Sequence, residues 1–370
     1  MNKKTLLSFL AVFLLLVFLI PGAVKADSAL AVLDNSARMD FPARLIFDIS
    51  AGSDTSITDI RLHYKVDRME HARVTSEVYV DFTPATTVKT QYILDMRKTG
   101  GLPPGSSLSY WWTVTDASGK KVETTPAGIH IEDGRYNWHK ITQKSVTLFW
   151  YQGDDSFAGE LMAATQQALT RLAENTGAEL ESPVSLYIYA NANDLKGSMI
   201  FPQEWTGGVS FTPYGIIAIG IAPTLSELEW GKRAIAHELT HLVIHQVTFN
   251  PYNELPVWLD EGLAMVAEGE LESDFTDALS KAEAGNKFIS VRSLASPFSA
   301  YAEQSVLAYA ESDRIVAYLI NDYGREKMFE LLSTFRRGSG YDEALNKVYG
   351  FDMDGLNAKW QASLVGAAVR

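Results

Sequence analysis

The chain has 370 residues, of which 46% are hydrophobic and 21% charged, a globular composition with room for two domains. It contains no cysteine, which excludes disulfide frameworks, thiolate zinc fingers and cysteine nucleophiles. Lys and Arg number 32 against 45 Asp and Glu, and the net charge of −13 argues against nucleic acid as a partner.

The amino-terminal residues 1–26 have the pattern of an export signal. Lys3 and Lys4 precede an apolar run from Leu6 to Ile20, and Val24-Lys25-Ala26 resembles a cleavage site. The run is shorter than the roughly 20 apolar residues of a bilayer span, which favours a cleaved signal peptide. If it were retained, the segment would anchor the chain in a membrane. Either way, we expect an extracytoplasmic protein, secreted or at the cell surface.

Residues 27–135 carry short alternating runs rich in β-branched and aromatic residues, separated by turn residues. The expected strands are Ala43–Ser50, Ile57–Val66, Arg73–Phe82, Val88–Leu94, Ser107–Thr115 and Gly128–Ile131. Strands of this number and spacing predict an all-β sandwich of the immunoglobulin-like or fibronectin-like type. His63, His71, His130 and His139 lie in or beside this half without a second ligand at helical spacing, and we expect surface or core histidines there.

Residues 136–370 change to a mixed pattern. Strands are expected at Val146–Tyr151, Val184–Tyr189 and Ile216–Ile221, and helices at Phe157–Ala173 and Leu225–Val247. Thr224 followed by Glu227 matches a capping box at the start of the second helix. Further helices are expected to the end, with breaks near Pro251, Pro297, Gly324, Gly338 and Gly350. The pattern predicts an α+β domain with a small sheet first and helices after it.

Residues 237–241 read His-Glu-Leu-Thr-His within the second of these helices. Histidines at i and i+4 share one helix face, so His237 and His241 can reach a single metal ion. Glu238 lies about 100° around the helix, which suits a base acting on a water molecule at the metal. Apolar residues surround the motif, and burying these polar groups without a partner would cost several kcal/mol.

His245 continues the i+4 series but is eight residues from His237, about 12 Å along the helix axis, too far to share one ion. We expect it to support another residue or to lie at the surface. The third ligand should therefore come from another element, and Pro256-Val257-Trp258-Leu259-Asp260-Glu261-Gly262-Leu263-Ala264 offers two acids near the start of a new helix.

This arrangement resembles the gluzincin metallopeptidases, in which a glutamate follows His-Glu-x-x-His. The spacing is similar to that of thermolysin-like enzymes, and Trp258-Leu259-Asp260-Glu261-Gly262 resembles the corresponding segment of aminopeptidase-N-like enzymes. The nearest resemblance is to proteins with a peptidase-MA-like domain. It implies a zincin-type fold for residues 136–370, one zinc ion held by His237, His241 and Glu261, and Glu238 as general base. Asp260 is the competing ligand by adjacency alone.

The resemblance also implies a tyrosine on a later helix that donates a hydrogen bond to the oxyanion. Tyr309 matches this position, with Tyr301 and Tyr318 as substitutes. A histidine-orienting aspartate of thermolysin-like enzymes would fall on Met265, so the orienting residues are open. By analogy with other zincins, the strand Gly215–Ile221 is expected to be the sheet edge along which a peptide pairs.

The sequence thus predicts an exported zinc metallopeptidase acting on a peptide or protein substrate. Two alternatives stay open: a surface-binding or adhesion protein whose metallopeptidase-like domain is inactive, and a zinc hydrolase of a non-peptide amide or ester. The sequence makes no prediction about the oligomeric state.

Overall fold

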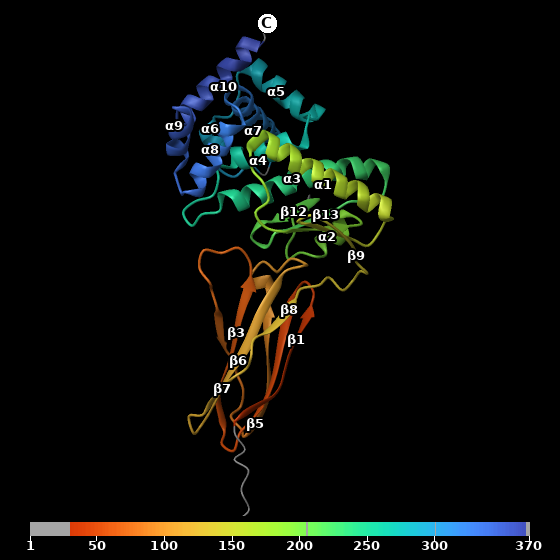
Figure 1. The fold of residues 1–370 in the computed structure, drawn as a ribbon, viewed down its shortest axis with the longest axis vertical. Coiled ribbons are helices and arrows are strands. Elements are labelled where there is room, and N and C mark those ends of the chain that lie inside the picture. The colour runs from red at the N-terminus through yellow and green to blue at the C-terminus, as the bar shows by residue number, and fades with distance from the viewer. Residues whose placement is uncertain (1–29, 205, 300, 368–370) are drawn as a thin grey trace, which may run out of the picture.

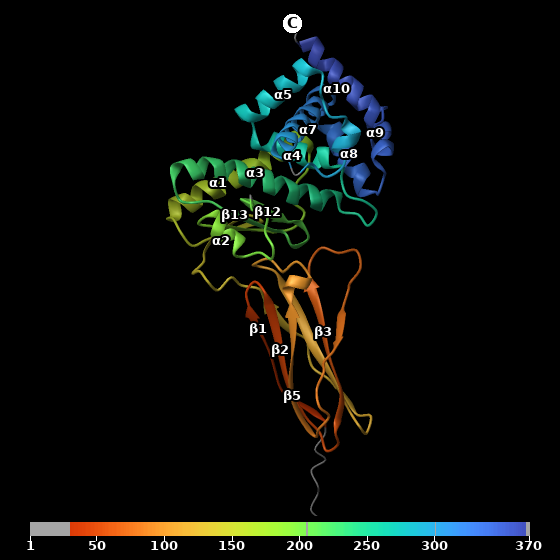
Figure 2. The same ribbon diagram turned by 180° about the vertical axis from the view of Figure 1, so that it is seen from behind.

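The computed structural model describes residues 30–204, 206–299 and 301–367. Its two parts follow one another along the long axis of the molecule: an elongated all-β part, and a part of mixed strands and helices that contains the carboxyl end (Figures 1 and 2). The predicted export segment, residues 1–26, lies outside the described residues. Within the described ranges, no helix is long and apolar enough to cross a membrane.

The all-β part consists of antiparallel strands in a three-stranded and a five-stranded sheet. The first contains β1 (Ala31–Asp40), β2 (Arg44–Gly52) and β5 (Thr87–Asp95); the second contains β4 (Ser76–Tyr79), β3 (Ile57–Asp67), β6 (Ser107–Asp116) and β7 (Lys121–Glu123), with β8 (Ala127–His130) paired to β6, and the short 3-10 helix η1 (Met96–Lys98) follows β5. Alternate side chains of the strands point inward, and Phe47, Leu62 and Trp112 are fully buried in one shared core.

Each of the six strands expected in this part is present, although the one expected at Arg73–Phe82 is only the four residues of β4. β1 and β7 were not expected. β1 contains Asp34, Asn35, Ser36 and Arg38, whose low strand propensity is overridden by pairing with β2 along its length. The all-β architecture is therefore as predicted, while its assignment to the immunoglobulin-like type stays a prediction.

The second part contains a mixed sheet in the order β12 (Gly208–Phe211), β13 (Ile216–Gly220), β11 (Val184–Tyr189), β10 (Val146–Trp150) and β9 (His139–Gln143). The three inner strands are parallel, and the two outer strands are antiparallel to their neighbours. The expectation that Gly215–Ile221 forms the sheet edge is wrong. β13 is internal because β12 covers it, with Val209 opposite Ala218 and Phe211 opposite Ile216.

The helices lie mainly on one side of this sheet and beyond it (Figures 1 and 2). They are α1 (Asp155–Thr176), α2 (Ala192–Lys196), α3 (Leu225–Thr248), α4 (Val257–Glu268), α5 (Ser273–Gly285), α6 (Val291–Leu294), α7 (Ala302–Tyr323), α8 (Arg325–Arg336), α9 (Tyr341–Tyr349) and α10 (Met353–Ala367), with the 3-10 helix η2 (Thr212–Tyr214) between β12 and β13. Leu186, Ile188, Ile217 and Ile219 share a core with the helices, whereas Tyr187 and Tyr189 belong to a separate cluster.

Local signals explain how α3 and α4 are positioned. The Thr224 hydroxyl accepts a hydrogen bond from the backbone N–H of Glu227 at 3.4 Å, as the capping pattern predicts. α4 begins directly after Pro256 and packs closely against α7. At Gly262 a Cβ atom would overlap the carbonyl oxygen of Ser312, so the glycine allows this close approach of the two helices.

Candidate metal centre

The two histidines of α3 lie on one face, one turn apart. Their Nε2 atoms are 3.1 Å from each other. The flanking residues Ile235, Leu239 and Leu242 are buried in the core, which holds the helix in place beneath the two rings. His237 and His241 themselves are only partly exposed, with 18% and 14% of their side-chain surface accessible.

Glu261 reaches the same point from α4. Its Oε2 atom lies 3.5 Å from the Nε2 atom of His237 and 3.5 Å from that of His241. This oxygen is buried and accepts no hydrogen bond from any residue in the described ranges. The ligand-type atoms of the three side chains all lie within 4.8 Å of one another.

These distances fit a tetrahedrally coordinated ion. Ligand atoms about 2.1 Å from a zinc ion in tetrahedral geometry are about 3.4 Å from each other, which is close to the observed 3.1 and 3.5 Å. The Nδ1 atom of each imidazole faces a carboxylate, so in the neutral rings both Nε2 lone pairs point at one another and at the Glu261 oxygen. A metal cation between the three atoms would satisfy all of them at once.

Two carboxylates orient the histidines: Glu268, for which the sequence predicted no role, and Asp260, which the sequence offered only as a competing ligand. Glu268 Oε1 lies 2.7 Å from Nδ1 of His237, and Asp260 Oδ2 lies 3.0 Å from Nδ1 of His241. Asp260 is therefore on the opposite edge of the His241 ring from the Glu261 oxygen, and it is absent from the three-residue cluster. Met265 is buried in the core, only 3% exposed, and Glu268 at the end of the same helix takes the orienting position.

The carboxylates also set the charge of the site. Burial lowers the pKa of His237, but the facing carboxylates of Glu261 and Glu268 outweigh it and raise this pKa to about 9. Burial raises the pKa of Glu261, while the facing imidazoles of His237 and His241 lower it to about 2. The site thus has a strongly negative potential that stabilises a positive charge between the three side chains.

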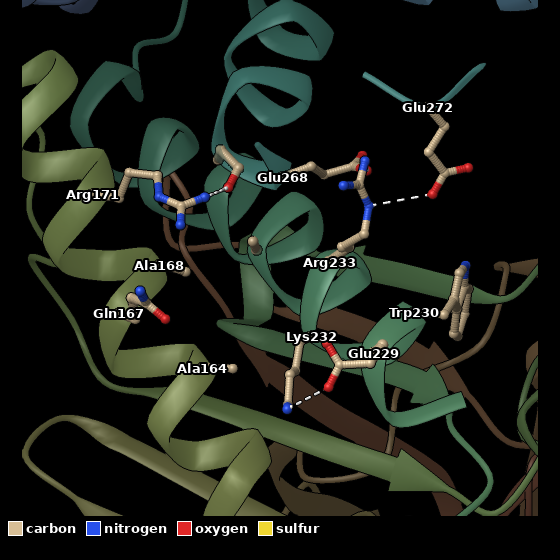
Figure 3. A pocket seen from close by; sticks show the side chains of 12 residues that line it. Ala164, Gln167, Ala168, Arg171, Glu229, Trp230, Lys232, Arg233, Glu268 and Glu272 are labelled. Atoms are coloured by element: carbon tan, nitrogen blue, oxygen red, sulfur yellow. Dashed lines mark hydrogen bonds and ion pairs between the residues drawn. The ribbon is translucent and has the colours of Figure 1, made fainter. Parts of the chain in front are cut away.

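Arginines from two helices contact the end of α4, one at the Glu268 carboxylate and one at the backbone before it (Figure 3). Arg233 Nη2 lies 3.3 Å from Glu268 Oε2, and the Arg233 Nε lies 3.4 Å from a carboxylate oxygen of Glu272. Arg171 of α1 donates to the carbonyl oxygen of Ala267 at 3.0 Å. These contacts border a cavity of about 430 Å³ between α1 and α3, and they link α1, α3 and the end of α4 to His237 through Glu268.

Glu238 occupies the neighbouring face of α3, against the edge strand. A Cβ atom at Gly208 would lie 3.1 Å from Oε1 of Glu238, so only glycine leaves the carboxylate its full space. The hydroxyl of Ser210 donates to the backbone carbonyl of Glu238 at 2.5 Å. β12 thus holds the backbone of Glu238 and leaves space for its side chain beside the histidine pair.

Of the three tyrosines considered from the sequence, Tyr309 is the one near this centre. Burial raises its pKa, and the nearby carboxylates of Glu261 and Glu238 raise it further. Its ring packs edge-on against Phe298 with centroids 5.1 Å apart. In contrast, Tyr301 is 75% exposed, and the Tyr318 hydroxyl lies 3.4 Å from that of Tyr323.

His245 lies outside the three-residue cluster. Its ring centroid is 5.3 Å from that of Phe249, and its buried Nε2 has no hydrogen-bond partner among the described residues. Burial lowers its pKa. It lines a cavity at the carboxyl-terminal end of α3, next to Phe249.

A helix with two histidines and a glutamate between them, joined by a second glutamate from the next helix, defines a site of the metallopeptidase class. The family model of the peptidase MA superfamily matches residues 164–366, more than half of the chain. The chain belongs to the peptidase MA superfamily, which confirms the resemblance drawn from the motif. A comparison with curated proteins finds no significant match.

Solved structures with similarity to the chain include an M1 zinc metallopeptidase from Deinococcus radiodurans, with 14% identity, a TM-score of 0.39, and coverage of 90% of this chain and 94% of that one. Aminopeptidase A from Legionella pneumophila, in complex with aspartic acid, has 12% identity, a TM-score of 0.40, and coverage of 90% and 50%. OgpA from Akkermansia muciniphila has 10% identity and a TM-score of 0.22, with 29% of this chain matched to 28% of that one. The chain thus spans less than a third of OgpA.

Proposed function

We propose that the protein is an exported zinc-dependent metallopeptidase in which His237, His241 and Glu261 hold one zinc ion. The observation that carries this proposal is the convergence of two Nε2 atoms and one buried carboxylate oxygen at 3.1 and 3.5 Å, with no hydrogen-bond donor for that oxygen in the described residues. Two imidazoles and one carboxylate form a ligand set typical of catalytic zinc sites, which leave one coordination position open for water or substrate.

When bound, zinc polarises the scissile carbonyl and lowers the pKa of water towards neutrality. Glu238 accepts the proton of the attacking water and delivers it to the leaving amine nitrogen, a role for which its place beside the histidine pair is suited. The hydroxyl of Tyr309 donates a hydrogen bond to the oxyanion. Glu268 and Asp260 keep the two imidazoles in the tautomer whose Nε2 atoms face the metal.

The substrate path in this proposal follows β12. This strand is an edge of the mixed sheet and lies along α3, with Gly207 beside Trp230 and Gly208 beside Glu238. An extended peptide pairing with the open side of β12 would place a carbonyl next to Glu238 and the metal ligands.

In this proposal the chain has a signal peptide at 1–26, an immunoglobulin-like sandwich at 27–135 and a zincin-type peptidase domain at 136–370. The protein acts outside the cytoplasm, either released after cleavage or held at the membrane by the uncleaved segment. Its partner is a peptide or protein substrate, and the net charge of −13 argues against binding to nucleic acid.

The proposal is tested by metal removal on the purified protein. We expect one zinc ion per chain, cleavage of a randomised peptide library, complete loss of cleavage after chelation, and recovery on adding one equivalent of zinc. If the zinc-loaded protein hydrolyses amide or ester model compounds but no peptide, it is a zinc hydrolase of non-peptide substrates and not a peptidase. Zinc without any hydrolysis would favour a binding protein.

Glu268→Gln is expected to weaken zinc binding by about 10- to 100-fold, because the amide no longer fixes the His237 tautomer with a charged acceptor. Competition with a coloured chelator measures the affinity directly. Glu272→Gln is the matched control, since Glu272 contacts the same arginine without contacting a histidine. Equal affinities for wild type and Glu268→Gln would contradict the orienting role.

Gly208→Ala is expected to lower kcat for peptide cleavage by about tenfold, since small displacements of a reacting group reduce rates strongly. The new methyl group would press on the Glu238 carboxylate at 3.1 Å, while zinc content should not change. Gly128→Ala in β8 is the control, because a Cβ there meets no atom within 4 Å. An unchanged kcat would show that β12 does not constrain Glu238.

A further inference from the structure

A second cavity, of about 590 Å³, lies beyond His241 at the carboxyl-terminal end of α3. His241 and its partner Asp260 form part of its wall, so a group bound in it would lie next to the candidate metal centre. Thr212 and Pro213, which directly follow β12, form another part. A peptide paired with β12 would therefore reach this cavity with a side chain close to the bond being cleaved.

The lining has a definite chemical character. Ile244, Leu255 and the ring of Phe249 supply apolar surface, and the Glu254 carboxylate supplies negative charge. The Asp260 carboxylate also lines the cavity but is paired with His241, and two further histidines, His71 and His245, are part of the lining. Among the described residues that line the cavity, none is a lysine or arginine. An aliphatic stem ending in a positive charge matches this combination, because the stem packs on the apolar wall and the charge pairs with a carboxylate or an aromatic face.

The all-β part contributes to the same wall. The loop after β3 extends toward the mixed part in Figures 1 and 2, and the N–H of Met69 donates to the carbonyl oxygen of Pro213 at 2.7 Å. The ring of His71 stacks on that of Phe249 with centroids 3.9 Å apart, and His71 lines the cavity. His71 is therefore part of the cavity wall, in addition to being a loop residue of the all-β part.

We propose that this cavity binds a lysine or arginine side chain of the peptide substrate. The carboxylate of Glu254 pairs with the positive charge of that side chain, and His71, from the all-β part, packs against its stem. The inference rests on the proposed peptidase function and names its substrate class. An acidic side chain is disfavoured because it would face the carboxylates of Glu254 and Asp260 in a lining whose described residues include no lysine or arginine. An uncharged side chain gains the apolar contact alone.

The test uses quenched fluorescent peptide pools, each with lysine, norleucine or glutamate fixed at one position and the other positions randomised. At one position beside the cleaved bond, we expect the lysine pool to be cleaved about tenfold faster than the norleucine pool, as a charge-assisted contact would give, and the glutamate pool most slowly. Equal cleavage of lysine and norleucine at every position overturns the inference while the peptidase function stands. Failure to cleave any pool overturns both.

Variants then assign the roles. Glu254→Gln is expected to lower kcat/KM for the lysine peptide by about fivefold to tenfold and to leave the norleucine peptide unchanged. Glu326→Gln, an acid on α8 with 85% of its side chain exposed, is the control that should change neither. His71→Ala is expected to raise KM for both peptides with the zinc content unchanged. A lysine preference that survives Glu254→Gln, or a KM that His71→Ala leaves unaltered, contradicts the assignment of that residue.

Discussion

Replacing Glu238 by glutamine is expected to lower kcat for peptide cleavage by about 10³-fold, within the range for loss of a general base. The amide has nearly the same shape as the carboxylate but cannot accept a proton from water. Since Glu238 is not one of the three clustered side chains, the zinc content should stay at one ion per chain. Steady-state kinetics and elemental analysis of the same sample measure both quantities.

The matched control is Glu227→Gln, an exposed acid in the first turn of the same helix. We expect this variant to retain the kcat of the wild type. If the Glu238→Gln protein cleaves peptides within threefold of the wild-type rate, Glu238 is not the general base of the reaction.

Glu261→Gln is expected to abolish cleavage by a different route, through loss of the metal. Its Oε2 faces both Nε2 atoms and has no other partner among the described residues, so the substitution removes a charged ligand and few other contacts. Zinc affinity should fall by more than the roughly 10- to 100-fold typical of an orienting partner. Equilibrium dialysis against zinc measures this change, and circular dichroism verifies that the fold is intact.

Asp260→Asn provides the comparison on the neighbouring residue, because Asp260 contacts Nδ1 of His241 but is not itself one of the three clustered side chains. Its zinc affinity should lie between those of wild type and Glu261→Gln. If Asp260→Asn loses zinc more completely than Glu261→Gln, the assignment of ligand and orienting residue is reversed.

The sequence was most informative where the signal is local. The i and i+4 spacing of His237 and His241 within an apolar helix predicts their shared face directly. Glu261 needed the family resemblance, because spacing alone left Asp260 as a competitor. The contact of Glu268 with His237 spans 31 positions in the chain and depends on the packing of α3 against α4, which no local pattern encodes.

The edge strand of the mixed sheet is a second feature that depends on pairing between strands and not on a local pattern. β12 has only four residues, and its Gly208 carries no strand preference. The longer apolar run of β13 gives the stronger signal, but fully buried runs are typical of internal parallel strands. Edge position is decided by pairing between strands, so the sequence predicted the strand and not its place in the sheet.

The assignment of His237, His241 and Glu261 as zinc ligands is tested most directly by a crystal of the zinc-loaded protein measured at the zinc absorption edge. The zinc assignment predicts one anomalous peak per chain, about 2.0–2.2 Å from Nε2 of His237, Nε2 of His241 and a carboxylate oxygen of Glu261. A peak held by other residues, or no peak between these three side chains at saturating zinc, would contradict it.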